Sequence, residues 1–142
     1  MKAKTYFLQA RSAERDLRRL EAVREHYIEL GSKITSHWGH TPPNSSSNGS
    51  KVETAVLGIV EAEKGIEGEY ERYMKIVLEA ERVISAVPQS RFRQILTLHY
   101  IVGLSLADTG DKLGYKDRNS IYRAHGWALA EAQKILDRKE GR

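Results

Sequence analysis

The chain has 142 residues, of which 40% are apolar and 30% charged, with a net charge of +4 at pH 7. This length suits one soluble domain or two very small ones, and argues against a large enzyme with a deep catalytic cavity. No apolar run reaches the roughly 18 residues of a membrane-spanning helix, and the first residues lack a secretion-signal pattern, so we expect a cytoplasmic protein without a membrane partner. The absence of cysteine excludes disulfides, thiolate zinc sites and cysteine nucleophiles.

The charge is distributed unevenly along the chain. Residues 1–36 carry a net +3, residues 51–87 a net −3 and residues 88–142 a net +4. Opposite charges are expected if the first two segments pack together, and a basic last segment is where a nucleic-acid contact is to be sought. A solvated surface explains charges of this size equally well. Between the first two segments, a Ser/Asn/Pro/Gly-rich stretch predicts a flexible loop at residues 37–50.

Apolar residues at heptad spacing predict a long helix on each side of this loop. In the first helix the row is Tyr6, Ala10, Ala13, Leu17, Leu20, Tyr27 and Ile34. In the second it is Val52, Val56, Ile59, Glu63, Ile66, Tyr70, Tyr73, Val77, Ala80, Ile84 and Val87. The two rows predict an antiparallel helical hairpin, a coiled coil over residues 1–87.

One charged residue interrupts each row, Arg24 in the first helix and Glu63 in the second. An antiparallel hairpin brings them to the same level, so we predict a buried pair that contributes register more than stability. Gly58 and Gly65 flank the second row, which indicates either close approach of the partner helix or a local irregularity. Gly68 has no explanation in the sequence pattern.

The last third of the chain, residues 88–142, has the spacing of a helix-turn-helix. Pro88 is suited to begin a supporting helix that ends at Gly103. Gly110 allows two helices to cross closely, and Gly114 allows the left-handed backbone that ends a helix. Asp117 is suited to cap the next helix, whose apolar positions are Ile121, Ala124, Ala128, Ala132, Ile135 and Leu136.

The start of that second helix presents side chains that recognise DNA. Asn119, Tyr122 and Arg123 are predicted to reach bases, because asparagine reads adenine and arginine reads guanine. Lys116 and Arg118 are predicted to position the helix on phosphates. Ser120 belongs to the same predicted DNA-binding set. A polar face that binds nothing is the alternative, and Trp127 is predicted to pack against the supporting helix in preference to forming a docking surface.

With these residues in place, the chain resembles the ArpU-like family of phage-encoded transcription regulators over nearly its whole length. The resemblance rests on the first heptad helix, the Ser/Asn-rich loop, the second heptad helix and the sequence from Tyr115 to Leu129. The last third is also similar to region four of bacterial sigma factors, although Gly114 and Ile121 are one residue further apart than in that pattern. The resemblance implies control of phage genes, often the late genes, by binding promoter DNA in the bacterial host cell.

No other chemistry is evident in the sequence. His37 and His40 are the only closely spaced histidines, and two ligands do not make a metal site. His99 and His125 are expected to be packed or bonded to the backbone. The acidic run of the second helix has no histidine partner, and Asn44 begins a chance glycosylation sequon. We therefore predict no enzyme, no cofactor and no metal site.

The sequence thus predicts an all-α protein, with an antiparallel helical hairpin at residues 1–87 and a sigma-region-four-like helix-turn-helix module at residues 88–142. The leading function is a sequence-specific regulator, an activator of late phage genes, whose partners are double-stranded promoter DNA, host RNA polymerase and possible second copies of itself. The alternative is an adaptor or inhibitor whose hairpin binds a host protein, RNA polymerase or a nuclease.

Overall fold

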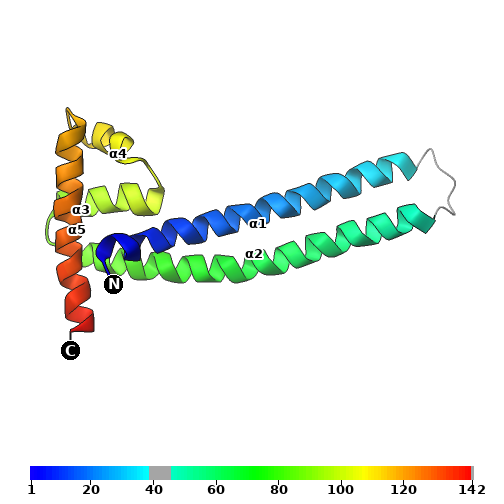
Figure 1. Ribbon diagram of the computed structural model, residues 1–142, viewed down its shortest axis with the longest axis horizontal. Coiled ribbons are helices and arrows are strands. Elements are labelled where there is room, and N and C mark those ends of the chain that lie inside the picture. Colours follow the sequence, from blue (N-terminus) through cyan, green and yellow to red (C-terminus); the bar gives the residue numbers. More distant parts are fainter. Residues whose placement is uncertain (39–45, 142) are drawn as a thin grey trace. The chain divides into compact units, whose positions relative to one another are not determined.

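The computed structural model describes the backbone of residues 1–38 and 46–141, and the side chains of residues 1–34 and 49–141. All secondary structure in these residues is helical, which confirms the predicted all-α class (Figure 1). None of the described helices is long and apolar enough to cross a membrane. The helices are α1 (Ala3–Trp38), α2 (Ser46–Ala86), α3 (Ser90–Leu96), the π-helix η1 (Thr97–Val102), α4 (Leu106–Leu113) and α5 (Arg118–Glu140).

The loop predicted at residues 37–50 is helical at both of its ends. Helix α1 continues to Trp38, and α2 begins at Ser46. Serine and asparagine are favourable at the first positions of a helix, so a polar segment can form its first turn. Just after that turn, the Thr54 hydroxyl donates to the Ser50 carbonyl at 2.9 Å. Residues 39–45, including His40 and Asn44, lie outside the described residues, as does the side chain of His37.

The chain divides into two compact units, one formed by residues 1–13 and 73–142 and the other by residues 14–72. We call them the head and the arm. The head contains the helix ends that α1 and α2 contribute, together with α3, η1, α4 and α5. The arm contains the remainder of α1 and α2.

Within the arm, α1 and α2 run in opposite directions. Tyr27 of α1 lies against Gly58 of α2, and Leu20 lies against Gly65. A Cβ atom added to Gly58 would lie 2.6 Å from the Tyr27 ring, and one added to Gly65 would lie 3.3 Å from Leu20. Both glycines therefore provide space for large side chains of the facing helix, which confirms close approach as the reason for them.

The face that α2 buries in the arm is displaced by one residue from the predicted row at alternate positions. Ala55 and Ala62 are buried with 4% and 6% exposure, whereas Val56 and Tyr70 are each 52% exposed. The predicted row placed large apolar residues of α2 in the seam. Large side chains of α1 already fill that space, so the residues of α2 that face them have to be small. Ile59 remains in the seam, as predicted.

The predicted buried pair of Arg24 and Glu63 is wrong. Glu63 is exposed, since Ala62 occupies the seam position beside it. Arg24 is half-buried, and its Nε atom is buried without a hydrogen-bond partner in the described part of the chain. Among the described residues, a charged contact between the arm helices is instead found at the surface, where Arg72 lies 3.8 Å from Asp16.

The head is organised around large side chains. The Phe7 ring is fully buried and stacks on Tyr100, with 5.2 Å between the ring centroids. The rest of this core consists of Ala3, Ala80, Val83, Ile84, Val87, Leu96, Ala128, Ala132 and Leu136. Residues before and after Pro88 thus share one core, and α5 supplies its last layer.

The supporting helix differs from its prediction in two details. It begins at Ser90, after an extended Gln89, so Pro88 precedes the helix and does not form its first turn. From Thr97 the helix widens into η1, which ends at Gly103 with a left-handed φ of 96°. The wider turn places Tyr100 in the core, a position that a regular helical spacing did not indicate.

Candidate nucleic-acid interface

Helix α4 has defined signals at both ends. The Ser105 side chain accepts a hydrogen bond from the Asp108 backbone N–H at 3.0 Å and so caps the start of the helix. The helix ends at Gly114, whose φ of 85° is left-handed. The Tyr115 N–H then donates to the Gly110 carbonyl at 2.8 Å, which completes a Schellman-type end. The predicted role of Gly114 is therefore confirmed.

Helices α4 and α5 cross closely at Gly110. A Cβ atom at this position would lie 3.1 Å from the Ile121 side chain of α5, closer than ordinary packing allows. Ile121 is 1% exposed and forms a small core with Ile95 and Ala124. A larger residue at position 110 would push the start of α5 away, so this glycine fixes the angle at which α5 is presented.

The turn between α4 and α5 is held from outside by Arg91 of α3. Its guanidinium donates to the Leu113 carbonyl at 2.7 Å and lies 5.6 Å from the centre of the Tyr115 ring. The sequence pattern did not single out Arg91, because its partners are a backbone carbonyl and a ring more than twenty residues away. It anchors the turn and contributes positive charge beside it.

Helix α5 begins with the predicted Asp117 cap. The Asp117 carboxylate accepts a hydrogen bond from the Ser120 backbone N–H at 2.8 Å. Hydrogen bonds from Ser120 lower the pKa of Asp117, and the nearby charge of Arg123 also lowers it. Ser120 is half-buried and serves this cap. Because the carboxylate occupies the helix N-terminus, a phosphate at this end would have to be held by side chains of Lys116 and Arg118.

The other predicted site residues share one exposed region around the first turns of α5. Lys116, Arg118, Asn119, Tyr122 and Arg123 are all exposed, and Tyr122 is 53% exposed. The opposite face of the helix is buried through Ile121, Ala124 and Ala128. In the described part of the chain, the side chains of Lys116, Arg118, Tyr122 and Arg123 form no hydrogen bond or ion pair. Their donors are therefore available to an external ligand.

The packing predicted for Trp127 is wrong, because its indole is 60% exposed. On α5, Ala128, Ala132 and Leu136 belong to the core around Phe7, and Ala124 belongs to the smaller core with Ile121. Trp127 does not share their face. The sequence offered no signal against packing, since a tryptophan in a helix is most often buried.

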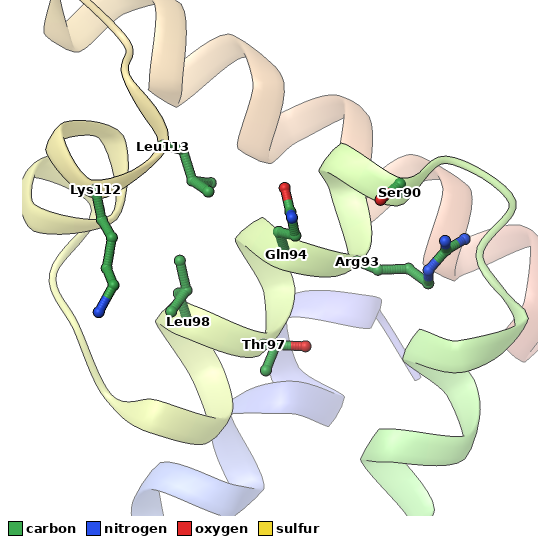
Figure 2. A pocket seen from close by; sticks show the side chains of 7 residues that line it. All are labelled: Ser90, Arg93, Gln94, Thr97, Leu98, Lys112 and Leu113. Carbon is green, nitrogen blue, oxygen red and sulfur yellow. The ribbon is translucent and has the colours of Figure 1, made fainter.

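An open groove of 480 Å³ lies between the supporting helix and α4. Figure 2 shows Leu98 and Leu113 among its lining residues and the Lys112 chain extending along one side. Arg93 is engaged at the other side, where it donates to the carbonyls of Val87 and Pro88 at 2.7 and 2.8 Å. The groove therefore adds one exposed cation, Lys112, to the basic side chains near the turn.

A buried polar cluster fixes α5 to η1 beneath this surface. The Tyr100 hydroxyl and His125 Nε2 share a hydrogen bond of 2.7 Å, and His99 Nδ1 donates to the Leu104 carbonyl at 2.6 Å. Arg11 of α1 donates to the His99 carbonyl at 2.9 Å. Burial lowers the pKa of His125 to about 4 and raises that of Tyr100 to about 12. Both histidines are packed or backbone-bonded, as predicted, and the cluster is structural.

Within the described residues, no group of three or more histidine, aspartate or glutamate side chains is placed to hold a metal ion. Comparison of the chain with protein families, with curated proteins and with solved structures gives no match. The parts of the structure that bear on its function are therefore α4, the turn and the start of α5.

Proposed function

We propose that this chain is a phage-encoded, sequence-specific regulator of transcription that binds promoter DNA through the start of α5, acting with host RNA polymerase as an activator of late genes. The observation that carries the proposal is the presentation of Arg118, Asn119, Tyr122 and Arg123 on a capped, tightly crossed helix. The resemblance of the sequence to phage regulators supplies the phage and late-gene part of the proposal.

The geometry suits a duplex because the recognition side chains lie on a rigid element. Gly110 sets the crossing, Gly114 ends α4, and Asp117 begins α5 at a defined residue. A helix held in this way can enter the major groove with its first turns at the base edges. Arg123 and Asn119 offer the hydrogen-bonding groups that distinguish guanine and adenine.

The charge around this surface favours a polyanion. Lys112, Lys116, Arg118 and Arg123 are exposed near the turn, and Arg91 lies beside Tyr115. Asp117 is an acidic group at the centre, but its charge is directed to the helix N-terminus by its bond to Ser120. Phosphates are thus expected at Lys116 and Arg118, on the two sides of that cap.

Titration of labelled duplexes with the full chain, followed by fluorescence anisotropy at low and near-physiological salt, tests this proposal. A DNA reader selects its own promoter fragments over random duplex, and its affinity falls steeply with salt because counterions are released. Arg123→Ala should cost about 1–3 kcal/mol on the selected site and relax the preference at one base. Lys116→Ala should weaken all duplexes alike.

Arg138→Ala is the matched control, since Arg138 is an exposed arginine at the other end of the same helix. It should leave the selective affinity unchanged. Equal losses for Arg123→Ala on selected and random duplex would refute base reading by this residue. Absence of any duplex binding at low salt would refute the proposed function.

A second candidate function, binding of a host protein through the arm, is favoured by an apolar patch on α2. Val56, Leu57 and Val60 are 52%, 62% and 41% exposed and lie close together on the helix. They lie on the outer face, opposite the buried Ala55 and Ala62. An exposed apolar patch of this kind is typical of a protein interface.

Substitution of a residue in this patch distinguishes the two candidate functions, DNA binding through α5 and protein binding through the arm. Exposed glutamates at positions 53, 63 and 67 and one exposed lysine, Lys64, lie around the patch, so the local charge is net negative and suits a basic protein surface better than a DNA phosphate. Leu57→Glu should abolish binding of purified host RNA polymerase while leaving duplex binding intact if both functions operate. If the chain is only an adaptor or inhibitor, Leu57→Glu should remove all binding, and Arg123→Ala should have no effect.

A further inference from the structure

Trp127 is a large side chain whose position the packing of the head does not explain. Its indole is 60% exposed, and it forms no ring contact or hydrogen bond with residues that the structure describes. Gly126 beside it has nothing within 4 Å of the position a Cβ atom would take. The small residue beside Trp127 is therefore not required by internal packing, and more than half of the Trp127 surface is accessible to a ligand.

The position of Trp127 on α5 connects it to the proposed reading face. Asn119, Arg123 and Trp127 follow one another at intervals of four residues, so they lie along one side of the helix. Ile121, Ala124 and Ala128 occupy the opposite, buried side. Asn119 and Trp127 are eight residues apart, which corresponds to roughly 12 Å along a helix, and the major groove is about 12 Å wide.

The charge on this side of the helix distinguishes between partners. Arg123 lies one turn before Trp127, and Lys134 lies two turns after it on the same side. Lys134 is 63% exposed, although its Nζ atom also contacts the Glu131 carboxylate at 3.0 Å. The acidic group one turn after the indole, Glu131, is paired with Lys134, so Arg123 is the neighbouring cation without an ion-pair partner among the described residues, and an anionic strand fits beside it. The apolar patch of the arm differs, because the exposed glutamates around it outnumber the one exposed lysine, Lys64.

We infer that Trp127 is a further DNA-contacting residue, which packs its indole on the sugar–phosphate strand bordering the groove that Asn119 and Arg123 read. This inference rests on the proposed function. The indole contributes apolar contact with the deoxyribose, and it limits how far α5 slides along the groove. Trp127 thus sets the position of the reading helix and does not itself read a base.

The test uses intrinsic fluorescence together with labelled DNA. The chain has two tryptophans, so Trp38→Phe leaves Trp127 as the only indole. Mixed-sequence duplex is added to this full-length variant at low salt, and tryptophan emission and anisotropy of the labelled duplex are recorded together. We expect a change in Trp127 emission that follows the same binding curve as the anisotropy.

Trp127→Ala should weaken duplex binding about tenfold, a loss typical of removing a buried aromatic contact. It should leave the slope of affinity against salt unchanged, because no charge is removed, whereas Lys116→Ala, which removes a phosphate contact, should lower that slope by about one. Trp127→Phe should retain most of the affinity. Leu78→Ala is the matched control, since Leu78 is an apolar residue of the head with 53% exposure, and it should bind as the parent does.

Three results would overturn the inference, and they are distinguishable. Normal duplex binding with unchanged Trp127 emission and no loss for Trp127→Ala would refute the indole contact while leaving the proposed function standing. A Trp127 emission that changes with protein concentration without DNA would show that a second copy covers the indole. Absence of duplex binding at low salt would refute both the contact and the proposed function. Circular dichroism of each variant verifies that it is folded.

Discussion

The head and the arm solve the problem of burying apolar surface in opposite ways. The head buries large rings and branched chains, such as Phe7, Tyr100 and Ile121, among several helices. The arm has only two helices, and its seam on α2 is lined with Gly58, Gly65 and alanines. Each of the two helices buries only one stripe of residues. Small residues on α2 let the helices approach each other closely, so α2 buries little side-chain volume of its own. The comparison shows that the large apolar residues exposed on α2 do not contribute to the seam between the arm helices.

Phe7→Ala should have the largest effect on stability. Phe7 is fully buried against Tyr100 in the head, and its truncation leaves a cavity that costs about 3–5 kcal/mol. Urea denaturation followed by circular dichroism measures the loss. Leu57→Ala in the arm removes a residue that is 62% exposed and serves as the control. A similar loss for both substitutions would contradict the contrast between the units.

The stability of the head should depend on pH through His125. Burial lowers its pKa in the folded protein to about 4, below the ordinary value of about 6.5. Because the pKa of His125 is lower in the folded state than in the unfolded state, neutral His125 stabilises the fold at pH values above about 6.5. This stabilisation is lost as the pH falls from about 6.5 to 4. The loss by pH 4.5 is about 2–3 kcal/mol.

Because carboxylates also titrate in this pH range, the contribution of His125 is obtained by comparing the parent with a variant that lacks the histidine. Unfolding free energies of the parent and of His125→Gln are compared at neutral and acidic pH. The variant is less stable at neutral pH but should lose less on acidification. Parallel pH profiles for the two proteins would show that His125 does not carry this dependence.

Glycine substitutions on α2 sharpen the contrast within the arm. Gly68 has nothing within 4 Å of an added Cβ atom, so Gly68→Ala should stabilise the helix by about 1 kcal/mol. Gly58→Ala places the methyl group 2.6 Å from the Tyr27 ring, and moving that ring offsets the gain. Thermal melting should therefore rise for Gly68→Ala only. A gain from both substitutions would mean that Gly58 is not needed for close approach.

The smallest expected effect is that of the surface ion pair in the arm. Arg72 lies 3.8 Å from Asp16 and 3.1 Å from Glu69, and all three side chains are partly or largely exposed. Exposed pairs contribute little because water screens them, so Arg72→Ala should cost less than about 1 kcal/mol. Thermal melting at low and high salt measures it. A loss comparable with that of Phe7→Ala would show that charge, and not the seam, holds the arm together.

Local signals in the sequence predicted the second half of the head well. Gly110, Gly114 and Asp117 have the crossing, turn and capping roles expected of them. These roles depend on backbone geometry over a few neighbouring residues, which composition and spacing reveal. By contrast, Arg91 acts on the same turn from another helix, and no local pattern connects it to Leu113.

The sequence by itself determined the helical class, the heptad rhythm of α1 and the polar start of α5, because periodicity and caps act over one or two helical turns. Only the tertiary structure decided that Ala55 and Ala62 form the α2 seam, that Glu63 and Trp127 are exposed, and that Phe7 and Tyr100 share a core. Those outcomes depend on the volume available between helices that are distant in the chain. A side chain's size indicates that it can be buried, while the facing helix decides whether there is room.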